Sequence, residues 1–212
     1  MDAGIGFVDL AGFTALTEAH GDSEAADLVE RFVAMAEAEA AEDDRVVKSI
    51  GDAVLLQSPS GHRVLEFAAR LMRRCGTEPG FPLSRGGVHS GPVVGRGGDV
   101  FGSTVNVAAR IAGQAHGGQL LLSHEVRSEV TGDGTEVVDL GEFDFRNVTG
   151  LVHLYELRLG LDHGCAGIDP VCRMRVERDS AAGRLRHRGK DYWLCSLACA
   201  KRFASDPDAF TS

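Results

Sequence analysis

Apolar residues occur along the chain in short stretches whose spacing predicts alternating strands and helices. A continuous apolar stretch over residues 5–10 predicts a first strand that is buried on both faces. Apolar positions at helical spacing then predict a helix that begins at Asp22 or Ser23 and continues to about residue 42. Two further apolar stretches flank a Gly-Asp pair and predict a β-hairpin over residues 46–56.

The same reading of the next hundred residues completes one predicted domain. Its expected elements are a helix over 62–75, a glycine-broken strand over 84–94, a turn over 95–98, a helix over 104–112, a strand over 119–122, a brief helix after Ser123, and a meander over 136–140, 143–146 and 153–158. The order β-α-β-β-α-β with further strands appended matches the split βαβ, or ferredoxin-like, arrangement. We therefore expect an α+β fold in which helices cover an antiparallel sheet largely on one face.

Charge separates the chain into two parts and excludes one class of partner. The 212 residues carry a net charge of −9, of which residues 1–160 contribute −11 and residues 161–212 contribute +2. The negative charge of residues 1–160 argues against non-specific nucleic-acid binding, which needs a basic surface. No apolar run approaches the roughly 20 residues of a membrane span, and no secretory signal is visible. We expect a cytoplasmic protein without a membrane span.

Cysteine usage divides the chain at the same place. Cys75 stands alone in the first part and is expected to be a small core residue. The other four cysteines lie within the last 48 residues, where a reducing cytosol favours metal or redox chemistry over structural disulfides. We expect a first domain over residues 1–159, a linker over 160–168 and a small module over 169–212. A module of this size is too small to build a strong hydrophobic core by itself, and the clustered cysteines are candidates for the cross-link or metal site that would stabilise it.

Two aspartates stand beside apolar stretches and are the first candidates for chemistry. Asp9 interrupts the first predicted strand, and Asp52 lies at the tip of the predicted hairpin. One reading is that Asp9 caps the following helix and Asp52 makes a turn. The other is that the two carboxylates are brought together around divalent cations, as in sites for phosphoryl and nucleotidyl transfer. Taken singly, the aspartates leave both readings open.

Four motifs decide in favour of the second reading. They are FVDLAGFT at residues 7–14, KSIGDAV at 48–54, GVHSGPVV at 87–94 and DVFGSTVNVAAR at 99–110. Together and in this order they resemble the catalytic domain of class III adenylate/guanylate cyclases, over about residues 5–158. The resemblance implies that Asp9 and Asp52 hold two Mg²⁺ or Mn²⁺ ions. It also implies that backbone amides of the strand and turn at 5–12 bind the phosphates, with Phe13 and Thr14 among the substrate-binding residues.

The resemblance also implies which nucleotide is bound and how it reacts. Lys48 and Asp99 match the pair that selects the base, and an ammonium donor with a carboxylate acceptor fits adenine rather than guanine. Asn106 and Arg110 match the catalytic pair that orients the ribose and neutralises charge on the phosphate being transferred. The implied reaction is the conversion of ATP to cyclic AMP and pyrophosphate.

Members of this family complete each site with residues from two chains, so the resemblance implies a head-to-tail homodimer with composite sites. One position departs from the family pattern, because Thr149 stands where a phosphate-binding lysine is usual. Arg146, three residues upstream, is a candidate substitute. An alternative function is therefore a weak or inactive cyclase-like sensor that binds nucleotide or a protein partner.

The C-terminal part carries a second resemblance. Cys172, Cys195 and Cys199 have the spacing Cys-x22-Cys-x3-Cys, with aromatic residues at Tyr192, Trp193 and Phe203 and an Asp-Pro pair at 206–207. These features resemble a YHS (TRASH-like) domain, which implies a metal-binding module. Thiolates favour Zn²⁺ or Cu⁺, and either Cys165 or His187 is expected as the fourth ligand. Buried free thiols and a redox pair are the alternatives, and the module is a candidate regulator of the first domain.

Overall fold

A seven-stranded sheet forms the centre of the computed structural model, which describes residues 1–130, 136–160 and 166–211. The elements that build it are β1 (Asp2–Leu10), α1 (Phe13–His20), α2 (Asp22–Glu39), β2 (Arg45–Ile50), β3 (Ala53–Ser58), α3 (Gly61–Thr77), β4 (Ser84–Pro92), β5 (Val94–Arg96), β6 (Asp99–Phe101), α4 (Ser103–Gln114), β7 (Leu120–Ser123), α5 (His124–Glu129), β8 (Val137–Asp144) and β9 (Leu151–Leu157). The strand order is β2-β3-β1-β4-β7-β9-β8.

The first four strands form the split βαβ unit that the sequence predicts. Strands β2, β3, β1 and β4 lie side by side and pair antiparallel throughout. The prediction of an antiparallel sheet is wrong at one place, because β4 pairs with β7 in parallel. A parallel neighbour needs a crossover connection, and the β5–β6 hairpin with α4 supplies it. The fold is therefore α+β with a mixed sheet.

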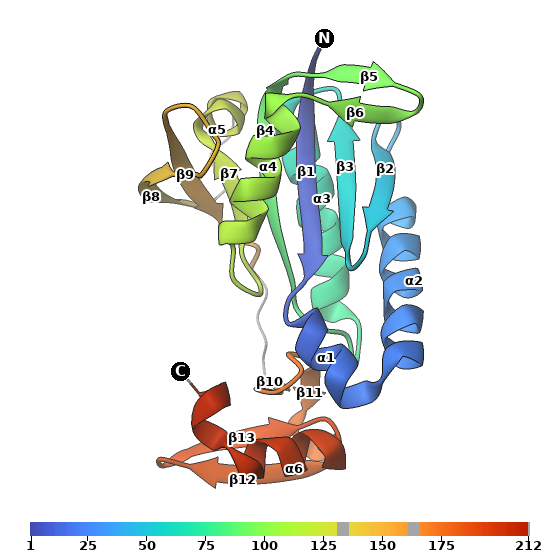
Figure 1. The fold of residues 1–212 in the computed structure, drawn as a ribbon, viewed down its shortest axis with the longest axis vertical. Helices are drawn as coiled ribbons and strands as arrows, with labels where there is room; N and C mark the ends of the chain where they lie inside the picture. Colours follow the sequence, from blue (N-terminus) through green and yellow to red (C-terminus); the bar gives the residue numbers. More distant parts are fainter. Residues whose placement is uncertain (131–135, 161–165, 212) are drawn as a thin grey trace.

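Helices cover both faces of this sheet, and the alternation of side chains along β1 shows why. Val8 and Leu10 belong to the buried cluster that includes Phe32 of α2 and Phe67 of α3. Ile5 points to the opposite face, where it joins a cluster with Ala108 of α4. Figure 1 accordingly shows α4 in front of β1 and β4 and α3 behind them.

Glycine in β4 allows α4 to lie unusually close to the sheet. A Cβ atom on Gly87 would stand 2.1 Å from the backbone nitrogen of Ala112 in α4. The sequence analysis treats the glycines of this stretch as interruptions of a strand, yet β4 runs unbroken from Ser84 to Pro92. Gly87 allows the backbones of α4 and β4 to approach closely because it has no side chain.

At two places the structure differs from the local predictions, and at a third it confirms one. Residues 13–20 form the helix α1, which the sequence analysis does not predict. The predicted turn at 95–98 is the tip of the β5–β6 hairpin. The predicted break at Gly141 is a β-bulge, because this residue has φ 83° and its amide donates to the side chain of Asp139, so that β8 continues to Asp144.

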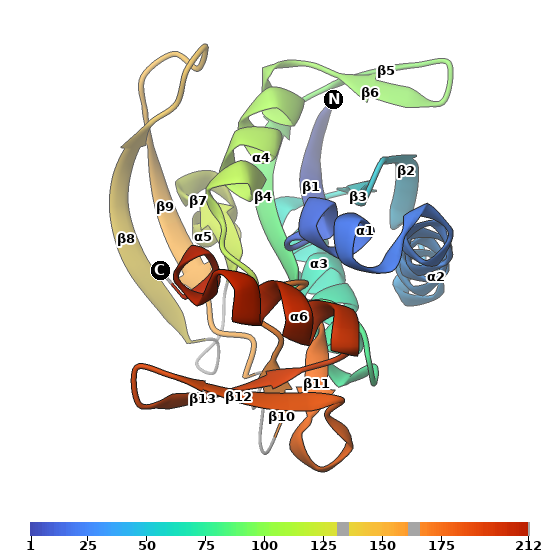
Figure 2. The ribbon, with the colours of Figure 1, turned by 60° about the horizontal axis from the view of Figure 1, so that its bottom comes forward.

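The C-terminal segment packs against the end of the sheet that carries α1. It comprises β10 (Ala166–Ile168), β11 (Arg175–Glu177), η1 (Arg178–Ser180), β12 (Gly183–His187), β13 (Lys190–Leu194), α6 (Leu197–Ser205) and η2 (Pro207–Phe210). Figures 1 and 2 show this segment below α1, and its helix α6 contacts α1. Strand β10 occupies the last residues of the predicted linker. The amide of Leu83 donates to Arg173, and that of Arg175 donates to Phe81.

One buried cluster runs through both parts of the molecule. Phe203 of α6 and Leu194 of β13 belong to the cluster that contains Leu10 of β1 and Phe81. Cys75 lies in the same cluster on α3, which confirms its predicted place in the core. Burial raises the pKa of the Cys75 thiol to about 12. The C-terminal segment therefore shares its core with the sheet.

Candidate functional site

Asp9 and Asp52 lie next to each other at one end of the sheet. Asp9 is the next-to-last residue of β1, and Asp52 lies in the turn between β2 and β3, where Gly51 takes φ 62°. The amide of Leu10 donates to the carbonyl of Asp52, which fastens the turn to β1. Burial raises the pKa of the Asp52 carboxyl, and the charge of Asp9 adds to the effect. The structure thus brings together the two carboxylates that the sequence analysis singles out.

Arg85 joins this acidic pair, and the sequence analysis does not foresee it. Its Nε and Nη2 donate to the two carboxylate oxygens of Asp9 at 2.7 and 3.0 Å. This two-point contact follows from the register of β1 and β4, which places Arg85 directly opposite Asp9. A third contact, from Nη1 to the carbonyl of Ala115, fixes the guanidinium. The pairing raises the pKa of Arg85 further.

The chain enters α1 immediately after Asp9. Gly12 takes φ 76°, the left-handed conformation that glycine adopts freely, and precedes the first helical residue. Phe13 is partly buried, and Thr14 is exposed. Intrahelical hydrogen bonds begin with the amide of Leu16, so the preceding amides of the first turn have no acceptor within the helix. Such amides can receive phosphate oxygens.

Lys48 and Asp99, the residues expected to select the base, form an ion pair. The Nζ atom of Lys48 on β2 lies 2.5 Å from Oδ2 of Asp99 on β6. The ammonium group lowers the pKa of the Asp99 carboxyl. A cavity of about 350 Å³ opens beside Lys48 and is also lined by Asn106, Phe7 and Phe101. The ion pair therefore stands at the edge of a hollow that has an apolar floor.

Asn106 and Arg110, the expected catalytic pair, lie exposed on α4 one helical turn apart. Asn106 also lines a second cavity of about 690 Å³, and Thr149 is among the other residues that line it. Arg146 is exposed but does not line this cavity. The position that departs from the family pattern thus faces the same hollow as Asn106.

The candidate residues fall into two groups on one face of the sheet. Lys48, Leu55 and Phe7 are cross-strand neighbours, and Asp9 follows Phe7 by two residues and so points to the same face. Among the described residues, no hydrogen bond or ion pair joins the Asp9–Asp52 group to the Lys48–Asp99 pair. The two groups are therefore separate patches of one surface within a single chain.

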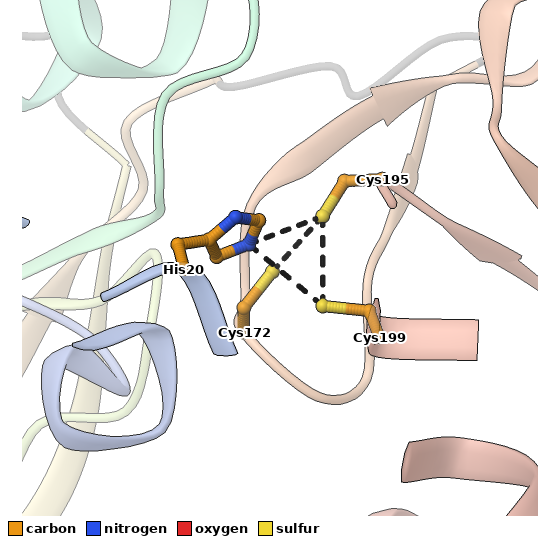
Figure 3. Close-up of side chains that lie close together, drawn as sticks. All are labelled: His20, Cys172, Cys195 and Cys199. Carbon is orange, nitrogen blue, oxygen red and sulfur yellow. Dashed lines mark hydrogen bonds between the residues drawn. The ribbon is translucent and has the colours of Figure 1, made fainter. Parts of the chain in front are cut away.

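The C-terminal cysteines form a cluster with a histidine from the first part of the chain. Figure 3 shows Cys172, Cys195 and Cys199 converging with His20, the last residue of α1. One potential ligand atom from each residue lies within 4.8 Å of the other three. Hydrogen bonds among the three thiols raise the pKa of Cys172 and lower that of Cys199. The sequence analysis identifies the three cysteines but misses the histidine.

The two fourth ligands expected from the sequence differ in what the structure says of them. Cys165 lies outside the described residues. His187 is wrong, because its Nε2 atom lies 2.8 Å from a carboxylate oxygen of Asp208, at the far end of the β12–β13 hairpin. The register places His187 opposite Lys190 at the turn, whereas Cys195 follows the opposite end of the hairpin. The length of the hairpin thus separates His187 from the cysteines.

The chain is similar in sequence to known nucleotide cyclases. Residues 1–159 match the family model of the adenylate and guanylate cyclase catalytic domain. A pH-sensitive adenylate cyclase of Mycobacterium tuberculosis is 37% identical over 161 residues, which cover 74% of this chain and 40% of that protein. An adenylate cyclase of Glutamicibacter nicotianae is 33% identical over 157 residues, covering 74% and 39%.

A solved structure supports the same fold. An adenylate cyclase from Trypanosoma brucei, described in its monomeric state, superposes with a TM-score of 0.67 at 21% identity, covering 74% of this chain and 87% of that one. The chain spans about two fifths of the length of the two curated relatives. No helix in the described ranges is both long and apolar enough to cross a membrane.

Proposed function

The chain belongs to the adenylate and guanylate cyclase catalytic domain family, and from this premise we propose that it converts ATP to cyclic AMP and pyrophosphate. One observation carries the proposal. The carboxylate pair, the Lys48–Asp99 pair and the exposed side of α4 lie on one surface of the sheet. That surface offers metal ligands, a base-selecting pair and a phosphate-binding arginine.

The acidic pair fits two divalent cations. Carboxylate oxygens are the ligands that Mg²⁺ and Mn²⁺ prefer. Burial and the neighbouring charge of Asp9 raise the pKa of Asp52, and a bound cation would oppose both effects. When bound, such cations would activate the ribose 3′-hydroxyl and stabilise the departing pyrophosphate. Arg85 orients the Asp9 carboxylate by donating to both of its oxygens. The first-turn amides of α1, with Phe13 and Thr14 beside them, are placed to bind phosphate oxygens.

Base selection falls to Lys48 and Asp99. Their ion pair lowers the pKa of the Asp99 carboxyl and holds this carboxyl beside Lys48, which lines the cavity. An ammonium donor fits adenine N1, and a carboxylate accepts from the 6-amino group, whereas guanine presents the opposite pattern. ATP is therefore the proposed substrate.

Transition-state binding falls to Asn106 and Arg110. Both residues project from the exposed side of α4. We assign Asn106 to the orientation of the ribose, and Arg110 to the charge that develops on the transferred phosphate. Thr149 provides no positive charge at the neighbouring loop, so the proposed activity is weaker than that of a chain with lysine there.

The proposed assembly is a head-to-tail homodimer. Because the two groups of site residues lie apart within one chain, each site needs the metal residues of one copy and the base and ribose residues of another. Ile50 and Phe101, each 50% exposed, flank the cavity beside Lys48 and provide apolar surface for a second copy. Together with the site residues they form a self-complementary face.

For the domain organisation we propose a cyclase domain over 1–159, a connection over 160–168 and a YHS-like metal-binding module over 169–212. The Cys-x22-Cys-x3-Cys spacing and the convergence of its three thiols support the module. Soft thiolate ligands favour Zn²⁺ or Cu⁺ there.

The first experiment is a cyclase assay on the purified full chain. We expect cyclic AMP from Mn²⁺-ATP, and none above background from Asp52→Ala, because that variant loses one carboxylate of the metal pair. Cyclic AMP formation at the same rate in both proteins would contradict the proposed cyclase activity. So would the absence of cyclic AMP from both. In the latter case, nucleotide binding measured by calorimetry would favour a cyclase-like sensor.

A further inference from the structure

We propose that His20 completes a tetrahedral metal site with Cys172, Cys195 and Cys199, so that one ion of the Zn²⁺ class joins α1 of the cyclase domain to the C-terminal segment. The site differs from a self-contained module because its fourth ligand comes from the other part of the molecule. His20 and Cys195 are separated by 175 residues in the sequence.

The spacing of the four ligand atoms fits a tetrahedron around one ion. With Zn–S bonds of about 2.3 Å and a Zn–N bond of about 2.0 Å, tetrahedral angles give edges of about 3.8 Å between sulfurs and about 3.5 Å from sulfur to nitrogen. The Sγ atom of Cys195 lies 3.4 Å from that of Cys172 and 3.7 Å from that of Cys199. The Nε2 atom of His20 lies 3.5 and 3.8 Å from the sulfurs of Cys195 and Cys199.

Neighbouring groups hold the four side chains in this arrangement. The other ring nitrogen of His20 lies 3.7 Å from a carboxylate oxygen of Glu24, the kind of partner that orients metal-binding histidines. Asp169 is fully buried and accepts from the amides of Val171 and Cys195 at 2.8 Å each. These contacts fix the two chain segments that carry Cys172 and Cys195. Figure 3 shows the side chains pointing toward one centre.

Ligand chemistry selects the class of metal. Three thiolates and one imidazole are soft and borderline ligands, which favour Zn²⁺ over Mg²⁺ or Mn²⁺. Cys172 and Cys199 are fully buried, and the His20 side chain is 9% exposed. A closed set of four protein ligands is typical of a structural zinc site.

The position of His20 gives the site a route to the catalytic surface. Helix α1 is eight residues long, and Gly12 at its start follows Asp9 by three residues. The C-terminal segment also reaches this start, because a Cβ on Gly12 would stand 2.7 Å from Cγ of Arg173, the neighbour of Cys172. The segment therefore contacts α1 at both ends. Metal binding would hold α1, and hence the turn after Asp9, in one position. The coupling of this site to catalysis rests on the proposed function.

Metal titration of the full chain tests the site. The reduced, metal-free protein is titrated with Co²⁺ and then Zn²⁺, comparing wild type with His20→Ala and with His187→Ala as the matched control. We expect one ion per chain, with the absorption of tetrahedral thiolate-bound Co²⁺, in wild type and in His187→Ala. His20→Ala should bind at least tenfold more weakly, since it loses one of four ligands.

A conservative variant separates ligation from folding. His20→Cys offers a thiolate at the same position and should regain tight binding and the metal-induced rise in Tm, both of which His20→Ala loses. Equal Co²⁺ affinity and spectrum in wild type and His20→Ala would overturn the proposal. So would a wild-type chain that binds no metal with all of its thiols reduced.

A cyclase assay in the same series tests the coupling. We expect Zn²⁺ to change the rate of the wild type and of His187→Ala at least twofold, and to leave that of His20→Ala unchanged. Equal responses in all three proteins would overturn the coupling. Failure of the proposed function is distinguishable, because it would show as no cyclic AMP in any of them while Co²⁺ binding stays intact.

Discussion

At the scale of single residues, the acidic pair stands in a balance of charges that one arginine maintains. Arg85 binds both oxygens of Asp9, whereas Asp52 lies in the tight turn after Gly51 and has no such arginine partner within the described parts of the chain. Burial and the neighbouring carboxylate both favour the neutral form of Asp52, which its raised pKa records. The folded chain thus tolerates a charge at a place where a cation would be favourable.

This balance predicts opposite effects of Asp52→Asn on stability and on activity. Without metal, the variant should melt about 1–2 °C higher than the wild type, because a neutral amide removes the repulsion from Asp9. Mn²⁺ with a non-hydrolysable ATP analogue should raise the Tm of the wild type but not of the variant. Differential scanning fluorimetry provides both measurements. A metal-free variant that melts well below the wild type would contradict this account of Asp52.

The sequence predicts the catalytic candidates better than the metal cluster because the two depend on different information. Asp9, Lys48 and Asn106 lie in motifs whose local strands and helices largely determine their placement. His20 lies in no motif, and only the packing of α6 against α1 brings it to the cysteines. His187 is nearer to them in the sequence, but the hairpin register carries it away. Arg85 similarly depends on the register between β1 and β4.

At the scale of elements, the loop between β8 and β9 contributes Thr149, and no positive charge at that position, to the cavity that Asn106 also lines. Phe145 anchors the loop in a cluster with Ile111 of α4, while Thr149 stays exposed beside the cavity shared with Asn106. The loop is thus held against α4 whatever residue occupies position 149. Its chemistry can change without a change in its placement.

Thr149→Lys should therefore increase activity. An ammonium group at this position would add a charged contact to the phosphates, and we expect kcat/KM for Mn²⁺-ATP to rise about tenfold. Thr149→Met is the matched control, because it adds a long side chain without charge. Steady-state assays of the three proteins measure the effect. A gain of the same size in Thr149→Met would show that charge is not its cause.

The elements themselves follow the sequence where the apolar pattern is long and periodic. Helix α3 and the β2–β3 hairpin are close to their predicted positions. Helix α1 is missed because only Leu16 is fully buried, which leaves an eight-residue helix without a clear apolar face. The bulge at Gly141 is missed because glycine permits both a turn and a bulge, and the pairing partner β9 decides between them.

At the scale of the whole molecule, the proposed composite site would make activity a property of pairs of chains, because the two groups of site residues lie apart within one chain. One copy presents Asp9 and Asp52 at the end of its sheet, and also Lys48 with Asn106 on the same face. A two-fold arrangement of two copies would build two equivalent sites.

Mixing two inactive variants tests this arrangement. Asp52→Asn and Arg110→Ala should each be inactive alone, because every site in each homodimer is defective. Co-refolded in equal amounts, they should regain about a quarter of the wild-type rate, since half of the dimers are mixed and each mixed dimer has one intact site. Analytical ultracentrifugation confirms dimer formation in the same samples. A mixture as inactive as its components would contradict the composite site.

The core that the C-terminal segment shares with the sheet has a consequence for the order in which the chain folds. His20 is synthesised well before Cys195 and Cys199, which follow it by 175 and 179 residues. Closing so long a loop is among the slowest contacts to form. The sheet can therefore assemble first, and the C-terminal segment packs against α1 afterwards. The cluster of His20 with the cysteines can close only after Cys199 has been synthesised, and so forms later than the contacts within the sheet.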